Sequence, residues 1–168
     1  MKKGWNITEK VIATILQAWA LFYLYLLTMA IYSKLQFGLQ TGGIKKEDIS
    51  FWELFRMFHF NYIAGLLCFY AGLMLLYDRK KGWVTSVIST IIFAGFMLVS
   101  GRNGVMKDNN THVMTSVSYL IAAVVFAAIF IVLVLKPFRV KYHPTTANWL
   151  FIMGVILLAV IDKTVFTL

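Results

Sequence analysis

This 168-residue chain is poor in cysteine, proline and acidic side chains, and each scarcity excludes a class of structure. A single cysteine, Cys68, cannot form an intrachain disulfide, so the cysteine content gives no indication of the redox compartment. The only two prolines, Pro137 and Pro144, provide no proline-rich linker between domains. Seven Asp and Glu residues occur in all, and no carboxylate-rich pair among them has the pattern of a Mg²⁺ site.

Charge of either sign is scarce, whereas apolar residues are abundant. Charged residues make up 14% of the chain and hydrophobic residues 60%, against about 25% and about 45–50% in soluble domains. The mean hydropathy is +0.76. A water-soluble fold cannot cover this much apolar surface, so we expect an integral membrane protein in contact with the lipid bilayer.

Most of the apolar residues fall in five runs. These are residues 11–32, 58–77, 83–100, 113–135 and 147–161, and the last is expected to continue as a span over 147–168. Four reach or approach the ~20 residues that cross ~30 Å of hydrocarbon, whereas the fifth crosses only if its helix continues past Asp162 to Leu168. None alternates as a membrane strand would. The sequence predicts an all-α, polytopic transmembrane helix bundle of about five spans, forming one domain over residues 1–168.

A short interfacial helix is expected to lead into the second span. Ser50-Phe51-Trp52-Glu53 fits a capping box, which places the start of a helix near Phe51. Its first turns are rich in aromatic residues, interleaved with Glu53, Arg56 and His59, as is typical of headgroup depth. The alternative is that these residues form the mouth of a substrate or partner site.

The net charge of +9 predicts topology rather than nucleic-acid binding, because the basic residues lie between the apolar runs. With five spans, one side carries Lys2, Lys3, Lys10, Arg79, Lys80, Lys81, Lys136, Arg139 and Lys141, opposed only by Glu9 and Asp78. The other side carries seven basic residues in longer loops that also hold five acidic ones. We therefore expect a plasma or inner membrane protein with a cytoplasmic N-terminus and an external C-terminus.

Small residues suggest how two of the spans pack. They recur every fourth position at Ala64, Cys68 and Gly72 in the second span and at Ser86, Thr90 and Ala94 in the third. Such stripes let helix backbones approach closely, so these faces predict a tight antiparallel hairpin. The fourth span has few polar atoms and is expected to be the most exposed to lipid.

Asp162 and Lys163 are the strongest functional candidates, because charges near the hydrocarbon are costly and usually face a protein interior. Neighbours on a helix do not face each other, so partners must come from elsewhere. Candidates on the same side are Arg56 and Lys107 for Asp162, and Glu53 and Asp108 for Lys163. Three readings stay open: an interfacial helix end, a structural ion pair, and an ion or proton site.

Two histidines, His59 and His112, are weak cofactor candidates. They begin the second and fourth spans on the same expected side, and paired histidines on facing helices can hold haem or a metal. The alternative is two ordinary interfacial histidines, and no cofactor is expected. His143, on the other side, is expected to have no role beyond the loop that contains it.

Gln17 and Asn61 are lone amides within apolar spans. Such groups usually bond across a helix interface, for about 0.6–2 kcal/mol. The alternative is contact with a pore or a substrate.

Catalytic motifs are missing: no nucleophile elbow, no His-Glu-x-x-His and no cysteine cluster occurs. We therefore expect a non-enzymatic accessory, scaffold or assembly subunit, acting through helix contacts with copies of itself or with a partner subunit. One alternative is a small oligomeric transporter or channel lined by Asp162, Lys163, Arg56, Glu53 and Gln17. Another is a membrane redox or lipid-modifying enzyme that uses His59 and His112.

Overall fold

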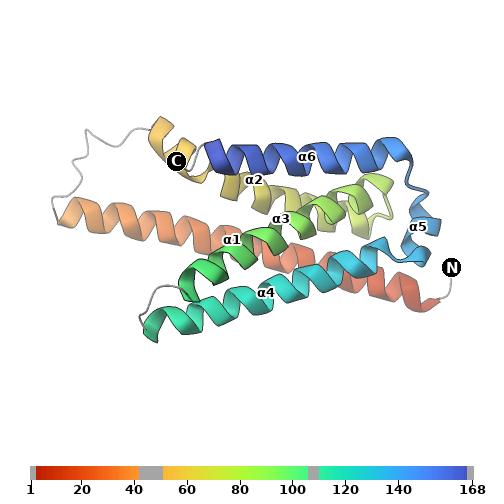
Figure 1. Ribbon diagram of the computed structural model, residues 1–168, viewed down its shortest axis with the longest axis horizontal. Coiled ribbons are helices and arrows are strands. Elements are labelled where there is room, and N and C mark those ends of the chain that lie inside the picture. The colour runs from red at the N-terminus through yellow and green to blue at the C-terminus, as the bar shows by residue number, and fades with distance from the viewer. Residues whose placement is uncertain (1–2, 42–50, 106–109, 166–168) are drawn as a thin grey trace.

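The computed structural model describes residues 3–41, 51–105 and 110–165, with the side chains of residues 3, 51, 53, 54, 57, 101–105 and 110–116 not described. Over these ranges the chain is helical, and no strand occurs in them. The helices are α1 (Lys3–Gln40), α2 (Phe51–Leu76), α3 (Lys80–Val105), α4 (Asn110–Val134), α5 (Lys136–Tyr142) and α6 (Thr146–Val165). Figure 1 shows α5 as a short link between two long helices.

Five of these helices, all except α5, are long and apolar enough to cross a membrane. The predicted class, an all-α bundle of about five spanning helices, is confirmed. The fifth run continues as α6 past Asp162 to Val165, and the expected extension to Leu168 lies outside the described residues. These helices indicate an integral membrane protein.

α1 is much longer than the run that predicted it. Its 38 residues extend about 57 Å at 1.5 Å per residue, roughly twice the thickness of a hydrocarbon core. Its C-terminal end projects past the other helices (Figure 1). α1 therefore carries the chain beyond the apolar layer before the second span begins.

The expected interfacial helix is the first part of α2 itself. α2 begins at Phe51, as predicted, and runs without a break into the apolar window Phe58–Leu76. Trp52 and Phe55 in its first turns are exposed, which suits aromatic rings at headgroup depth. The predicted capping box lies outside the description, because it depends on Ser50 and on the Glu53 side chain.

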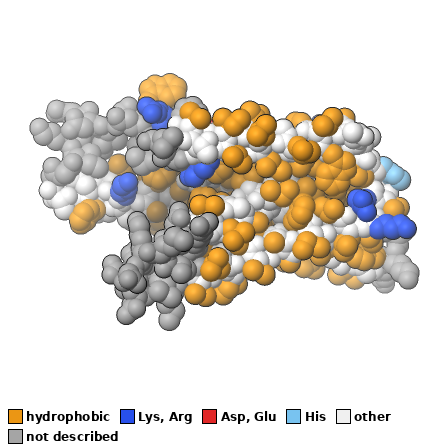
Figure 2. All heavy atoms as spheres, viewed as in Figure 1, with side chains coloured by type: hydrophobic (Ala, Val, Ile, Leu, Met, Phe, Trp, Pro, Cys, Tyr) orange, Lys and Arg blue, Asp and Glu red, His pale blue; other side chains and the backbone are white. Residues whose placement is uncertain are grey.

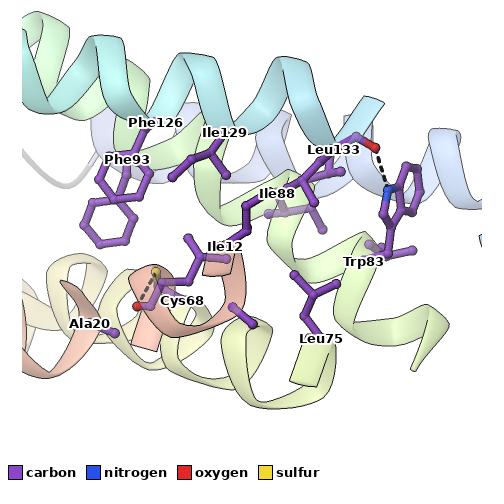
Figure 3. Packing of buried hydrophobic residues seen from close by; sticks show 14 of the residues in the cluster. Ile12, Ala20, Cys68, Leu75, Trp83, Ile88, Phe93, Phe126, Ile129 and Leu133 are labelled. Atoms are coloured by element: carbon purple, nitrogen blue, oxygen red, sulfur yellow. Dashed lines mark hydrogen bonds between the residues drawn. The ribbon is translucent and has the colours of Figure 1, made fainter. Parts of the chain in front are cut away.

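Aromatic rings join α1, α3 and α4 at the centre of the bundle. The rings of Phe93 and Phe126 stack with their centroids 5.2 Å apart, and Tyr23 and Trp19 meet them edge-on at 5.1 and 5.3 Å. Figure 3 shows the stacked pair, together with the Trp83 indole N–H that donates to the Leu133 carbonyl oxygen at 2.8 Å. These contacts lock α3 onto α4, since each aromatic pair contributes about 0.5–1.5 kcal/mol beyond the area it buries.

The small-residue face of α2 packs on α1, and the prediction that it faces α3 is wrong. A Cβ at Gly72 would lie 2.7 Å from the Ala13 carbonyl oxygen, and one at Gly65 would lie 2.6 Å from Leu24 Cδ2. The Cys68 thiol between them donates to the Leu16 carbonyl oxygen at 3.5 Å (Figure 3). Gly65, Cys68 and Gly72 share one side of α2 at helical spacing, and sequence cannot tell which neighbour that side meets.

α2 and α3 nevertheless form an antiparallel pair through another face. The Ser86 hydroxyl donates to the Ala71 carbonyl oxygen at 3.4 Å, and both residues are buried. At the turn, a Cβ on Gly82 would lie 2.4 Å from the backbone of Met74 and Leu75, so only glycine fits there. The predicted hairpin therefore exists, with Ser86 but not Gly72 in its interface.

α6 is the span least covered by the rest of the chain. Ile152 is its one fully buried residue, whereas α4 buries Ala123, Phe126, Ile129 and Leu133. The expectation that the fourth span is the most lipid-exposed is therefore wrong. On the face shown in Figure 2, apolar side chains cover the middle and basic side chains lie toward the two ends, as expected for a bundle that crosses a bilayer.

Gly72→Leu should destabilise the protein strongly, because the added side chain meets α1 backbone that cannot move aside. We expect a loss of about 1–3 kcal/mol, seen as a lower thermal midpoint of the detergent-solubilised protein. Gly95→Leu is the matched control, since a Cβ at Gly95 has no neighbour within 4 Å. Equal midpoints for the two variants would contradict the α1–α2 packing described above.

Candidate functional site

Asp162 and His59 come together where α6 ends and the apolar part of α2 begins. The His59 Nε2 lies 3.1 Å from Asp162 Oδ1 and 3.2 Å from Oδ2. Both side chains are largely covered, with 14% of His59 and 28% of Asp162 exposed. The sequence singled out both residues, but for different purposes, and it did not pair them.

The geometry of His59 determines how many protons the pair holds. The Nδ1 atom faces the carbonyl oxygens of Phe55 and Arg56 at 3.1 and 2.9 Å, and because carbonyls only accept, Nδ1 carries a proton and donates. A neutral ring would then turn the bare lone pair of Nε2 toward an ionised carboxylate. The contact therefore requires a second ring proton, on Nε2, which makes the ring a cation and the pair neutral overall.

Lys163 lies on the same turn as Asp162 but points elsewhere. Its Nζ lies 5.6 Å from the ring centroids of both Phe60 on α2 and Phe96 on α3. An ammonium group at this distance is attracted to ring faces, by about 0.5–1 kcal/mol at exposed sites and more where water is excluded. Lys163 thus bridges two helices through their aromatic side chains.

The partners expected for these two charges are placed differently or lie outside the description. Arg56 is exposed, and its carbonyl rather than its guanidinium takes part in the cluster. Lys107 and Asp108 lie outside the described residues, as does the Glu53 side chain. Among the described groups, Asp162 therefore pairs with His59, which the sequence suggests as a weak cofactor ligand or an ordinary interfacial histidine but not as a partner of Asp162.

His59 has no lone pair to offer a haem or a metal in this arrangement, because both of its ring nitrogens are engaged. The His112 side chain lies outside the description, so the predicted histidine pairing stays a prediction. Within the described ranges, no three His, Cys, Asp or Glu residues are grouped closely enough to hold a metal ion. The His143 carbonyl accepts a hydrogen bond from Lys80 Nζ at 2.8 Å at the end of α5, which is a contact within the loops.

The two lone amides lie between α1 and α2. Asn61 Oδ1 accepts a hydrogen bond from the Tyr23 hydroxyl at 3.1 Å. The Gln17 side chain packs where Gly72 leaves room for it, since a Cβ on that glycine would lie 2.7 Å from Gln17 Cγ. Farther along the same interface, the hydroxyl groups of Thr28 on α1 and Tyr62 on α2 lie 3.2 Å apart. These polar side chains thus connect α1 to α2.

A second charged cluster, which the sequence analysis missed, lies at the other end of the bundle. The Lys141 ammonium on α5 donates to the carboxylates of both Glu9 on α1 and Asp78 in the α2–α3 turn. Glu9 is fully buried, whereas Asp78 is exposed and adopts a left-handed backbone with φ of 54°. One lysine therefore connects three segments that are far apart in the sequence.

Both partners determine the charge of Lys141. Its partial burial alone would lower the pKa, but hydrogen bonds to Asp78 and Glu9 outweigh that effect and hold the pKa of Lys141 above its ordinary value. The ammonium therefore stays charged at physiological pH, and its stabilising contribution is lost only as pH rises through that raised pKa. The sequence contains a signal for this cluster, because the spacing of Glu9 from Ile12, Ala13 and Leu16 places it on the same helical face as these buried residues.

A scan against protein-family models finds no match, and searches of curated proteins and of solved structures find none either. Function must therefore be inferred from the chemistry of the residues themselves.

Lys141→Met should leave the buried Glu9 carboxylate without its cation. We expect a loss of about 3 kcal/mol in unfolding free energy, near the low end for a broken buried pair because 19% of the lysine side chain is exposed. Adding Glu9→Gln to this variant should recover most of the thermal midpoint. A double variant as unstable as the single one would show that Lys141 acts by packing on Tyr142 instead.

Asp162→Asn tests the shared proton. An asparagine amide can donate to Nε2 without any additional proton, so this variant should fold with a thermal midpoint that depends less on pH. The native pair binds one more proton than a separated carboxylate and neutral imidazole, so the wild-type midpoint should fall as pH rises above the ordinary histidine pKa of about 6.5. Parallel curves for the two proteins in detergent would refute the proton count.

Proposed function

We propose that this chain is a non-catalytic membrane subunit that acts by helix contacts with a second copy of itself. The observation that carries the proposal is how the polar side chains of its spans are used. His59, Asp162, Asn61 and Tyr23 bind partners within the chain, between neighbouring helices. Groups engaged in this way support a scaffold better than a path for ions or polar substrates.

α6 supplies the surface for that contact. It buries one of its 20 residues, and its large side chains Leu150, Leu157 and Ile161 are 65%, 61% and 46% exposed. These positions recur at helical spacing and so form a continuous apolar face. A second α6 against this face would cover a helix that the chain's own packing leaves almost uncovered.

The alternative function, a small oligomeric transporter or channel, has less support from the described residues. Asp162 and Gln17 line none of the described cavities, and Lys163 lines one whose other walls are almost wholly apolar. An aqueous path would require polar groups that face a shared space. The pairing of Asp162 with His59 instead favours a structural role at a helix contact.

Disulfide cross-linking in native membranes tests the α6 contact. With Cys68 replaced by alanine, single cysteines at Leu150, Leu157 and Ile161 should form covalent dimers on mild oxidation, because paired Cα atoms must come within about 7 Å. Val124 is the matched control, since it is 68% exposed on α4. Equal yields at Val124 would indicate random collision, and no dimer at any α6 position would contradict self-association through α6.

We further propose that the end of the bundle holding Lys141 faces the cytoplasm. The start of α1, the α2–α3 turn and α5 meet there through Lys141, and Figure 1 shows the N-terminus beside α5. The dense basic residues of these segments therefore gather at one end, which supports a cytoplasmic assignment by the positive-inside rule.

Reporter fusions test this orientation. Fusions after Lys81 and Lys141 should read as cytoplasmic, and a fusion after Leu168 should read as external. A reporter with cytoplasmic activity at Leu168 would contradict an odd number of crossings.

A further inference from the structure

A groove of about 490 Å³ runs between α3 and α6, with α2 at one end. It extends from Ile91 to Ser100 on α3 and from Ile156 to Lys163 on α6, which is roughly 10–14 Å at 1.5 Å per residue. Its volume falls within the range of about 300–1,000 Å³ that is typical of ligand pockets. Its described lining residues are apolar except at one end, where Ser100 and Lys163 lie.

Lys163 is held over that polar end. Its Nζ lies 5.6 Å from the ring centroids of Phe60 and Phe96, and both of these residues also line the groove. These contacts place the ammonium group at the mouth of the groove. A positive charge therefore lies at one end of an apolar groove.

The depth of this charge in the membrane follows from its neighbour. Asp162 binds His59, which is the second residue of the apolar window Phe58–Leu76 of α2. Lys163 therefore lies at the level where the second span meets the headgroups. From there the groove runs back toward the middle of the bilayer along α3 and α6.

We propose that this groove binds one acyl chain of an anionic phospholipid, with the lipid phosphate at Lys163. The apolar walls match a hydrocarbon chain, and the ammonium matches the charge of the headgroup at the depth where headgroups lie. A phospholipid supplies both parts in one molecule that already surrounds the protein. The site goes beyond the proposed scaffold function and does not depend on it.

Gly95 gives the site its depth and provides the means to test it. Gly95 lines the groove, and a Cβ built on it meets nothing within 4 Å. A leucine at this position therefore enters open groove volume without displacing backbone. Ala159 lines the groove on the α6 side, and Ala159→Leu narrows it from there.

Native mass spectrometry of the full-length protein measures the binding directly. The detergent-solubilised protein is mixed with equal amounts of phosphatidylglycerol and phosphatidylcholine that carry the same acyl chains. Wild-type protein should retain phosphatidylglycerol about fivefold better, the factor that corresponds to about 1 kcal/mol for one lysine beside an anionic headgroup. Lys163→Gln should abolish this preference, whereas Gly95→Leu and Ala159→Leu should lower the retention of both lipids.

Matched controls separate the groove from general attraction. Lys81→Gln removes the same charge from the opposite end of the bundle, and Gly4→Leu adds the same side chain to α1 outside the groove, where a Cβ also meets nothing within 4 Å. Both control variants should behave like wild type. Equal retention of the two lipids by wild type would overturn the proposal, as would an equal effect of Lys81→Gln and Lys163→Gln.

Two further outcomes bear on the occupant. Full retention by both Gly95→Leu and Ala159→Leu would show that the chain does not enter this groove, and thermal midpoints close to wild type would confirm that the variants are folded. Added oleate that displaces phosphatidylglycerol at equal concentration would assign the site to free fatty acid and overturn the phospholipid proposal.

Discussion

The rest of this structure depends on one constraint, which is that a polar group surrounded by hydrocarbon must find its partner within the protein. The backbone meets it by forming helices throughout the spans. The side chains meet it in pairs, as in His59 with Asp162 and Tyr23 with Asn61. Because each partner sits on a different helix, satisfying the polar atoms also fixes how the helices are arranged.

The two charged clusters satisfy this constraint by different kinds of pairing. At one end, Lys141 joins three segments by ordinary ion pairing and is shared between the buried Glu9 and the exposed Asp78. At the other end, the pairing of His59 and Asp162 holds only while one proton is retained. Lys141 keeps its charge over physiological pH, whereas the contact of His59 with Asp162 depends on the pH at its end of the bundle.

Much of the fold could be predicted from sequence because hydropathy reports directly on the lipid environment. The five spans and the start of α2 at Phe51 follow from apolar runs and local signals alone. Which faces meet does not follow, because any small-residue stripe suits any neighbour. Gly72 illustrates this, since its spacing indicates close packing but only the tertiary structure shows that the neighbour is α1.

For the candidate sites too, the sequence predicts some residues but not their partners. Asp162 was conspicuous because a carboxylate near the end of a short apolar run is costly, yet its pairing with His59 depends on the relative height of α2 and α6. Glu9 is harder to predict, because it lies among the basic residues near the N-terminus and resembles a loop charge, although it continues the buried face of Ile12 and Leu16. A periodicity test that includes charged residues would have detected it.

The link between Glu9 and Lys141 also sets an order of assembly, because the two residues are 132 positions apart. At about 5–20 residues per second, a ribosome needs roughly ten seconds to make the chain between them. Throughout that interval the first helix exists without the cation that its buried carboxylate needs. The ion-paired end of the bundle, where α1 meets α5, is therefore completed only after α5 has been synthesised.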